Sequence, residues 1–233
     1  MLSGAFILYS LYYFELDPIY TCTFLDGSTS DLCSQSMVCN PKNNSILTFE
    51  VNYKTNKSLR NWIEQYDLGC ASKIYRSMIG SCFLAGCFLG SFILPRLADI
   101  KGRKPLFLVG LVLYAFAVVG LLVSSNKWLM YMFLVLGGVA ETGRYYVAYV
   151  YIIEIFPVRL QNGAGLGIFI CFAICKVLIC LFFMLTESRN WRVCAYVALT
   201  LAALSFFLVL FFLPESPRFL FDQKKYTEAT QVL

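Results

Sequence analysis

Apolar residues gather in six runs along the chain, and shorter segments rich in charged and polar residues separate these runs. A helix that crosses a membrane needs about 20 consecutive, mostly apolar residues. The runs are Met1–Leu16, Ile74–Leu94, Leu106–Val123, Trp128–Ile153, Gly163–Leu185 and Val193–Leu213. The pattern predicts an all-α integral membrane protein with six transmembrane helices. Because the first run is short, we expect its helix to be truncated at the upstream end.

The polar segments divide the chain into four parts. Residues 1–16 form the first helix, 17–73 a long polar loop, 74–213 the other five helices, and 214–233 the start of a further helix. The spacing Gly-x-x-x-Gly occurs at Gly86–Gly90 and again at Gly163–Gly167. Small residues four positions apart let helix backbones approach closely within lipid, so we expect both pairs to mark helix contacts.

The composition agrees with a membrane location and narrows the range of possible functions. Of the 233 residues, 59% are hydrophobic and 14% are charged, whereas soluble domains have about 45–50% apolar and about 25% charged residues. The net charge of +5 comes from basic residues at the ends of the apolar runs, which argues against nucleic acid as a partner. The sequence has no His, the commonest general base and metal ligand. We therefore expect neither an enzyme nor a metal or cofactor site.

The long polar loop carries two glycosylation sequons, at Asn43 and Asn56, which indicate that it lies outside the cell. It also holds four of the ten cysteines, namely Cys22, Cys33, Cys39 and Cys70. Four cysteines outside the membrane predict two disulfides, with three possible pairings. Four unpaired thiols are the alternative. A signal peptide in place of the first helix is a second alternative, and it leaves the loop outside as well.

A short basic stretch, Pro95–Pro105, separates the second apolar run from the third. It holds four basic residues and one acid, and Lys and Arg favour loops that stay in the cytosol. We expect a tight cytosolic turn in which Gly102 adopts a positive φ and Pro105 lies in the first turn of the next helix. A basic loop without any further role is the alternative.

Three charged residues lie near the middle of apolar runs. Glu141 and Arg144 each cost about 2.5–3.5 kcal/mol at the centre of a membrane helix, which cancels most of the favourable contribution of their apolar neighbours. Their helix therefore needs protein neighbours or a water-filled cavity. With Lys176 in the fifth run and Tyr145 beside Arg144, they are the candidate substrate-binding residues. The alternatives are an internal ion pair between Glu141 and Arg144, and a Lys176 side chain that snorkels out of the membrane.

Four short motifs resemble motifs of known transporters. The sequences Leu-Ala-Asp-x-x-Gly-Arg-Lys at 97–104, Tyr-x-x-Glu-x-x-Pro at 151–157 and Pro-Glu-Ser-Pro-Arg-Phe-Leu at 214–220 resemble the cytosolic motifs of major facilitator superfamily transporters. The sequence Gln-Tyr-Asp-Leu-Gly-Cys at 65–70 resembles the element before the second helix of organic cation/anion transporters, which are solute carriers. A large, glycosylated loop with cysteines after the first helix is also typical of that family.

This resemblance implies a fold, a mechanism and partners. Such transporters are built from two six-helix bundles, each of two inverted three-helix repeats, and this chain resembles the N-terminal bundle. We expect alternating-access transport of small organic ions, facilitative or ion-coupled, in the plasma membrane, together with a C-terminal half that is missing or separate. The resemblance also implies a cytosolic charge network, or gate, that steadies the outward-facing state. Its members would be Asp99, Arg103, Glu154, Arg159, Glu215 and Arg218.

Three other functions stay open at this point. A sugar porter is the alternative within transport, although the long loop with cysteines stands against it. A half that modulates a full-length relative without transporting is the second. An intramembrane enzyme is the third, and the lack of His and of paired carboxylates argues against it.

Overall fold

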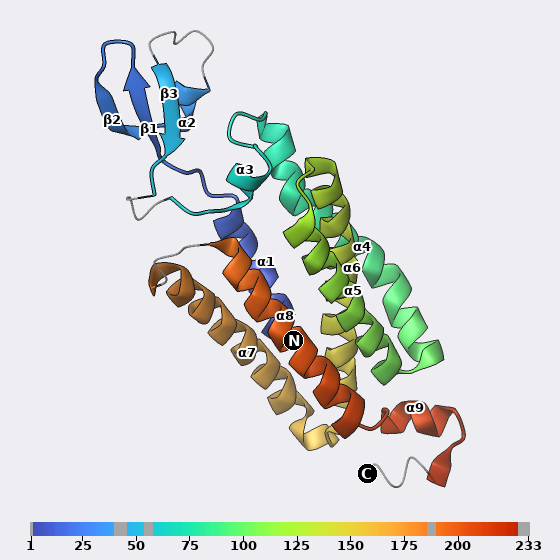
Figure 1. Ribbon diagram of the computed structural model, residues 1–233. Helices are drawn as coiled ribbons and strands as arrows, with labels where there is room; N and C mark the ends of the chain where they lie inside the picture. Colours follow the sequence, from blue (N-terminus) through green and yellow to red (C-terminus); the bar gives the residue numbers. More distant parts are fainter. Residues whose placement is uncertain (1, 40–45, 54–57, 186–189, 228–233) are drawn as a thin grey trace.

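The computed structural model describes residues 2–39, 46–53, 58–185 and 190–227 (Figure 1). Asn43 and Asn56, the asparagines of the two sequons, lie outside the described residues. The long helices are α1 (Leu2–Phe14), α4 (Lys73–Lys101), α5 (Arg103–Val123), α6 (Lys127–Ile155), α7 (Val158–Leu185) and α8 (Trp191–Phe212). The short helices are α2 (Gln35–Val38), α3 (Trp62–Gln65) and α9 (Pro217–Asp222), and the strands are β1 (Tyr20–Phe24), β2 (Thr29–Cys33) and β3 (Ile46–Val51).

The long helices pack side by side, with the three strands beyond one end of the bundle and α9 at the other (Figure 1). Of the described helices, α4, α5, α7 and α8 are long and apolar enough to cross a membrane. This confirms the prediction of a helical integral membrane protein. α6 has 29 residues and thus the necessary length, but Glu141 and Arg144 lower its hydropathy, as the sequence indicated.

Two sets of helix contacts hold the bundle together. α6 packs along α4 and α5, while α1 packs against α7 and α8; α8 also contacts α5 and so joins the two sets. The closest approach is between α4 and α6. A Cβ atom on Gly86 would lie 2.1 Å from the carbonyl oxygen of Val135, and one on Gly138 would lie 2.1 Å from that of Phe83. Only glycine fits at such a backbone contact.

Only the first of the two Gly-x-x-x-Gly pairs marks a helix contact. Within the described residues, a Cβ atom on Gly163 or on Gly167 would meet nothing within 4 Å. The expectation that both pairs mark close helix packing is therefore wrong for the second, because α7 passes its neighbours at a greater distance there. Spacing alone cannot show which helix faces are in contact.

The connections at the α9 end are shorter than the sequence predicted. α4 continues through Pro95 as far as Lys101, so Gly102 alone separates it from α5. The positive φ expected for Gly102 is confirmed at 102°, and Pro105 lies in the first turn of α5. The expected loop from Pro95 is wrong because an α-helix does not have to end where its apolar stretch ends. Charged side chains beyond the membrane point into water, and the helical backbone hydrogen bonds continue.

The last segment, 214–233, for which the sequence predicted the start of a further helix, holds α9 and a turn after it. α9 ends at Asp222, and residues 223–225 form a turn in which Lys224 has a φ of 61°. The next residues, Tyr226 and Thr227, are helical again. Helices often end at a residue with positive φ, most often glycine, and Lys224 takes this conformation after α9. The polar segment therefore contains two short helical pieces within its described part.

The polar loop contains a small sheet that the sequence did not predict. β1 pairs with β2 and with β3, in both cases antiparallel, which gives the strand order β2-β1-β3. Tyr20, Cys22 and Cys33 form its buried centre. Disulfides join Cys22 to Cys33 and Cys39 to Cys70. The first links two strands of the sheet, and the second ties the residue after α2 to the chain just before α4.

Candidate functional site

Charged residues from three helices meet at the α9 end of the bundle, where Arg103 begins α5. Its guanidinium group binds Glu154 of α6 through two nitrogens, with distances of 3.0 Å to Oε1 and 3.2 Å to Oε2. A third contact of 2.8 Å joins the same group to Asp99 of α4. The side chains of Arg103 and Glu154 are only 11% and 6% exposed, whereas Asp99 is 69% exposed. The shielded pair carries most of this interaction, because solvent screens an exposed ion pair.

Glu215 adds the chain after α8 to this group. Its Oε1 atom accepts hydrogen bonds from the backbone N–H groups of Arg103 and Lys104, at 2.9 and 3.1 Å. These are the first N–H groups of α5, which have no partner within the helix, and the positive end of the helix dipole favours a carboxylate there. A Cβ atom on Gly102 would lie 2.8 Å from Glu215 Oε2, so a side chain at this position would displace the Glu215 carboxylate, in addition to the strain of a positive φ.

Two hydroxyl groups that the sequence analysis missed complete the arrangement. Ser216 Oγ donates a hydrogen bond to Glu154 Oε2 at 2.5 Å, and Tyr151 of α6 donates one to the carbonyl of Pro214. Ser216 lies within the recognised motif at 214–220 and Tyr151 opens the motif at 151–157, so both positions were available as signals, although neither hydrogen bond could be read from the motifs. We call Asp99, Arg103, Glu154, Glu215 and Ser216 the charge cluster.

The structure brings together four of the six residues expected in the gate. Arg159 and Arg218 are exposed, and neither belongs to any of the ion pairs found within the described parts of the chain. Arg159 lies in the first turn of α7, where neighbouring Val158 is 81% exposed. Arg218 lies on the exposed face of α9, which buries Pro217 and Leu220 instead. That the charge cluster acts as a gate stays a prediction.

Glu141 and Arg144 of α6 form an internal ion pair. Arg144 is 1% exposed and Glu141 is 8% exposed. The guanidinium carbon of Arg144 lies 3.7 Å from the centre of the Tyr114 ring of α5, an arrangement in which the cation interacts with the aromatic face. α5 therefore provides the protein neighbour that the charges required. The arrangement matches the alternative that the sequence left open, and substrate contact by these two residues stays a prediction.

Lys176 and Tyr145 lie where α1, α6 and α7 come together. Lys176 is exposed on α7, and its Nζ atom lies 4.4 Å from the ring centre of Tyr9 of α1. Tyr145 of α6 packs edge-on against Phe172 of α7, with ring centres 5.1 Å apart. We call Tyr9, Tyr145, Phe172 and Lys176 the aromatic face. Aromatic rings attract cations and Lys176 attracts anions; that this face contacts substrate stays a prediction.

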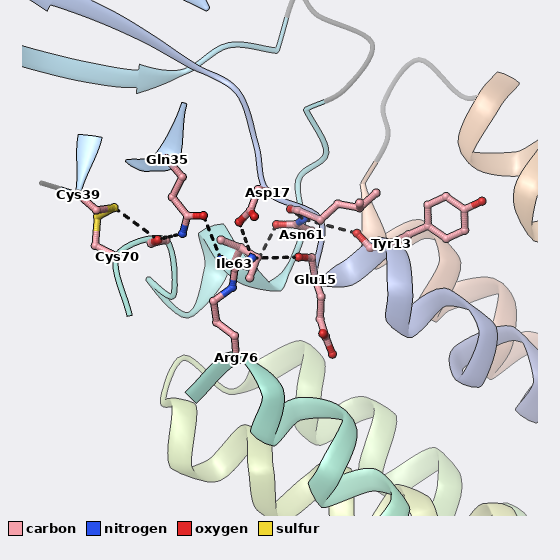
Figure 2. A network of polar contacts seen from close by, with 11 residues as sticks. Tyr13, Glu15, Asp17, Gln35, Cys39, Asn61, Ile63, Cys70 and Arg76 are labelled. Atoms are coloured by element: carbon pink, nitrogen blue, oxygen red, sulfur yellow. Dashed lines mark hydrogen bonds and ion pairs between the residues drawn. A yellow bond between two sulfur atoms is a disulfide. The ribbon is translucent and has the colours of Figure 1, made fainter. Parts of the chain in front are cut away.

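At the sheet end, Arg76 near the start of α4 holds three segments together (Figure 2). It forms an ion pair with Asp17 and donates hydrogen bonds to Gln35 Oε1 at 3.0 Å and to the Glu15 carbonyl at 3.4 Å. Gln35 in turn donates to the carbonyl of Gly69, beside the Cys39–Cys70 disulfide. These contacts fix the polar loop onto the ends of α1 and α4.

A second group of contacts at this end orders the chain around α3. Asn61 donates to the Leu16 carbonyl at 2.6 Å and accepts from the N–H of Ile63 at 3.2 Å, which caps α3 (Figure 2). Tyr53 donates a hydrogen bond to Glu64 of α3. Burial raises the pKa of Tyr53 to about 12, and the bond to Glu64 acts in the same direction. The phenol therefore stays protonated and remains a donor at neutral pH.

Comparison with known proteins relates the chain to transporters. The family model described as "Sugar (and other) transporter" matches residues 36–233. The chain is 25% identical over 221 residues to the "Organic cation transporter protein" of Drosophila melanogaster, covering 95% of the chain and 38% of that relative. It is 28% identical to "Organic cation/carnitine transporter 5" of Arabidopsis thaliana, covering 94% of the chain and 44% of the relative. It is 31% identical to "Solute carrier family 22 member 4" of Mus musculus, covering 73% of the chain and 31% of the relative. The chain spans less than half the length of each of these relatives.

Proposed function

Because the chain belongs to the sugar (and other) transporter family of the major facilitator superfamily, we propose that it forms one half of a transporter for small organic ions. Transport would proceed by alternating access, in which two bundles rock about a central site. The substrate class is supported by relatives that are named for organic cations and carnitine. The partner would be a second six-helix bundle, which is consistent with relatives more than twice the length of this chain. The chain is not an enzyme, because the family and its relatives are transporters.

The proposed fold has two inverted three-helix repeats, α1-α4-α5 and α6-α7-α8. Helix lengths support the match of α4 with α7 and of α5 with α8, because α4 and α7 have 29 and 28 residues, while α5 and α8 have 21 and 22. α4 and α7 also carry the two Gly-x-x-x-Gly pairs. The polar loop 17–73 would lie outside and carry glycans at Asn43 or Asn56, and the α9 end would face the cytosol, in the plasma membrane.

The charge cluster is the observation that carries this proposal. It joins the inner ends of α4 and α5, from the first repeat, to the end of α6 and the chain after α8, from the second. Opposite charges at converging helix ends stabilise the closed arrangement and lose this stabilisation when the ends separate. Asp99, Arg103, Glu154 and Glu215 would therefore hold the cytosolic side closed in the outward-facing state. Arg159 and Arg218 would join only if a second bundle completes the network.

The aromatic face is the proposed substrate-contacting surface of this half. Lys176 is exposed beside an aromatic ring, although a lysine in a membrane helix normally lies toward protein or water. In the complete transporter the second bundle would cover this surface and enclose the site. Glu141 and Arg144 would then support the site from behind, by fixing the position of α6.

The test is uptake into proteoliposomes that contain the chain alone or together with a C-terminal six-helix half. The substrates are tetraethylammonium as an organic cation, benzoate as an organic anion, and glucose. We expect no saturable uptake by the chain alone, and saturable uptake of one organic ion when the second half is present. Saturable uptake of glucose instead would support the sugar-porter alternative. Saturable flux through the chain alone, with chemical cross-linking that detects only monomer, would contradict the need for a second half.

Variants of the assembled pair test the site. Lys176→Gln should reduce uptake of the organic ion, whereas Lys127→Gln should leave it unchanged. Lys127 is the matched control because it also lies over a tyrosine ring, 4.9 Å from the centre of Tyr75, but at the sheet end of α6. Equal uptake by both variants and by the wild type would show that the aromatic face does not contact substrate. Absence of uptake from a correctly assembled pair would contradict the transport function itself.

A further inference from the structure

An apolar cavity of about 590 Å³ lies beside the charge cluster, between α5, α6, α7 and α8. Its walls include Phe107 of α5 and Ile168 of α7. Leu208 of α8 and Leu213, the residue after α8, also line it. The charged residues of the lining are the neighbours Arg103 and Lys104, both at the beginning of α5. The cavity therefore has an apolar body and two basic lining residues at one end, called the cationic end, beside which the carboxylates of the charge cluster contact Arg103 and Lys104.

The cavity reaches from the α9 end into the hydrophobic part of the bundle. Along α8 its lining extends from Leu213 back to Ser205, and along α7 from Ala164 to Cys171. Eight residues of an α-helix span about 12 Å. The space is thus elongated and follows the helix axes, with its cationic end at the level where the apolar stretches stop.

The polar groups of the lining are largely engaged with the protein. Ser205 donates to the carbonyl of Leu201 at 2.7 Å, and Tyr151 donates to the carbonyl of Pro214. Arg103 is held by Glu154 and Asp99. Deep in the cavity, a strongly polar solute would find few groups to bind, and its desolvation would be uncompensated.

Lys104 differs from its neighbour. Its Nζ atom donates one hydrogen bond to the carbonyl of Leu210, at 3.0 Å, and an ammonium group has three donors. Lys104 takes part in none of the ion pairs found within the described ranges of the chain. Its charge is therefore available to an anion at the cationic end of the cavity.

We propose that this cavity binds an anionic membrane phospholipid, with one acyl chain between α7 and α8 and the phosphate on Lys104. An elongated apolar space that ends in a cation at the membrane boundary matches the shape and charge of such a lipid. Anionic lipids are concentrated in the cytoplasmic leaflet, and each Lys or Arg near that surface strengthens their binding. The inference uses the proposed orientation but not the transport activity, so either can fail without the other.

Native mass spectrometry of the purified, delipidated chain in mild detergent tests the site. Phosphatidylserine and phosphatidylcholine with identical acyl chains are added in equal amounts. We expect preferential binding of phosphatidylserine, and about a five-fold loss of that affinity in Lys104→Gln. Lys101→Gln is the matched control, because Lys101 is exposed at the end of α4 and does not line the cavity. It should retain the affinity of the wild type.

A second variant tests where the acyl chain lies. Gly167 lines the cavity, and a Cβ atom there would meet nothing within 4 Å among the described residues. Gly167→Leu should therefore fold, since leucine favours a helix over glycine, and it should reduce binding of both lipids by filling the space. Equal losses in Lys104→Gln and Lys101→Gln would overturn the proposal, because they would indicate general surface attraction. Unchanged lipid binding in Gly167→Leu, or loss of bound lipid when a C-terminal half assembles, would also overturn it.

Discussion

Glu215 and Arg103 are 112 residues apart in the sequence, yet the Glu215 carboxylate accepts a hydrogen bond from the Arg103 backbone N–H at 2.9 Å. One carboxylate thereby caps α5 and fixes the chain that leaves α8. The same Arg103 uses its side chain to bind Glu154 at the end of α6. Backbone and side chain of a single residue thus connect three helices, which makes the charge cluster sensitive to the loss of any one buried member.

The cap formed by Glu215 gives the first prediction. Glu215→Gln should lower the free energy of unfolding of the chain by about 1–2 kcal/mol, because the start of α5 loses a charged acceptor. Thermal unfolding of the purified chain in detergent measures the effect. Arg218→Gln is the control, since Arg218 lies three residues further along and is exposed. Equal unfolding midpoints for the two variants would show that the cap does not stabilise the bundle.

The second prediction separates the two carboxylates that bind Arg103. Glu154→Gln should destabilise the chain by about 3–5 kcal/mol, because it leaves a shielded guanidinium without its main partner. Asp99→Asn should cost only about 0.5 kcal/mol, because Asp99 is 69% exposed.

Cysteine labelling gives an independent measurement of the same pair. A cysteine introduced at Phe156, which is 41% exposed beside the cluster, should react faster with a water-soluble maleimide in Glu154→Gln than in Asp99→Asn. Equal rates and equal stabilities in both variants would mean that these carboxylates are ordinary solvated charges.

The close contact between α4 and α6 gives the third prediction. Gly86→Ala should destabilise the chain by about 1–3 kcal/mol, because the added methyl group would overlap the Val135 carbonyl. Gly163→Ala should be neutral or stabilise by up to about 1 kcal/mol, because that position is open and alanine favours a helix. Limited proteolysis or thermal unfolding compares the two. Similar behaviour of both variants would contradict the packing seen between these helices.

The helices could be predicted from the sequence because their signal is local. Each apolar run corresponds to one long helix, and the motifs at 97–104, 151–157 and 214–220 indicated where Asp99, Glu154 and Glu215 meet. Helix ends were less predictable, since α4 continues to Lys101 beyond its apolar stretch. The length of an apolar stretch reflects the thickness of the membrane. A helix ends where its backbone leaves the helical conformation, which here happens at Gly102.

The rest depends on contacts between distant segments. The pairing of β1 with β3 joins Tyr20 to Val51, across a stretch with little regular alternation. Nothing in the spacing of Arg159 showed that its side chain would be exposed and outside the charge cluster. The sequence identified Glu141 and Arg144 as needing shelter, but only the structure shows that the Tyr114 ring of α5 provides part of it.

The fourth prediction concerns the cysteines. Alkylation of the denatured but unreduced protein, followed by mass spectrometry, should modify only six of the ten cysteines. The reactive ones are those that the structure leaves as free thiols, namely Cys82, Cys87, Cys171, Cys175, Cys180 and Cys194. Peptides that contain Cys22 should be linked to peptides that contain Cys33, and Cys39 to Cys70. Ten alkylated cysteines would exclude both disulfides, and a different linkage would exclude this pairing.

The last prediction decides between a structural and a substrate-binding role for Glu141 and Arg144. Glu141→Gln should lower the free energy of unfolding by about 3–5 kcal/mol, because Arg144 is 1% exposed and would keep a charge without its carboxylate partner. Removing both charges together should be less harmful, because an apolar pair has no desolvation cost. The double variant Glu141→Leu/Arg144→Met should therefore recover most of the lost stability.

The matched control is Lys176→Gln, which removes an exposed charge from α7 and should leave stability unchanged. Thermal unfolding of the four proteins, including the wild type, gives the comparison. If Glu141 instead faces substrate and water, Glu141→Gln should unfold at the same temperature as the wild type. The double variant should then be no more stable than the single variant. That outcome would reject the internal ion pair, because a carboxylate in a hydrated cavity does not depend on one buried partner.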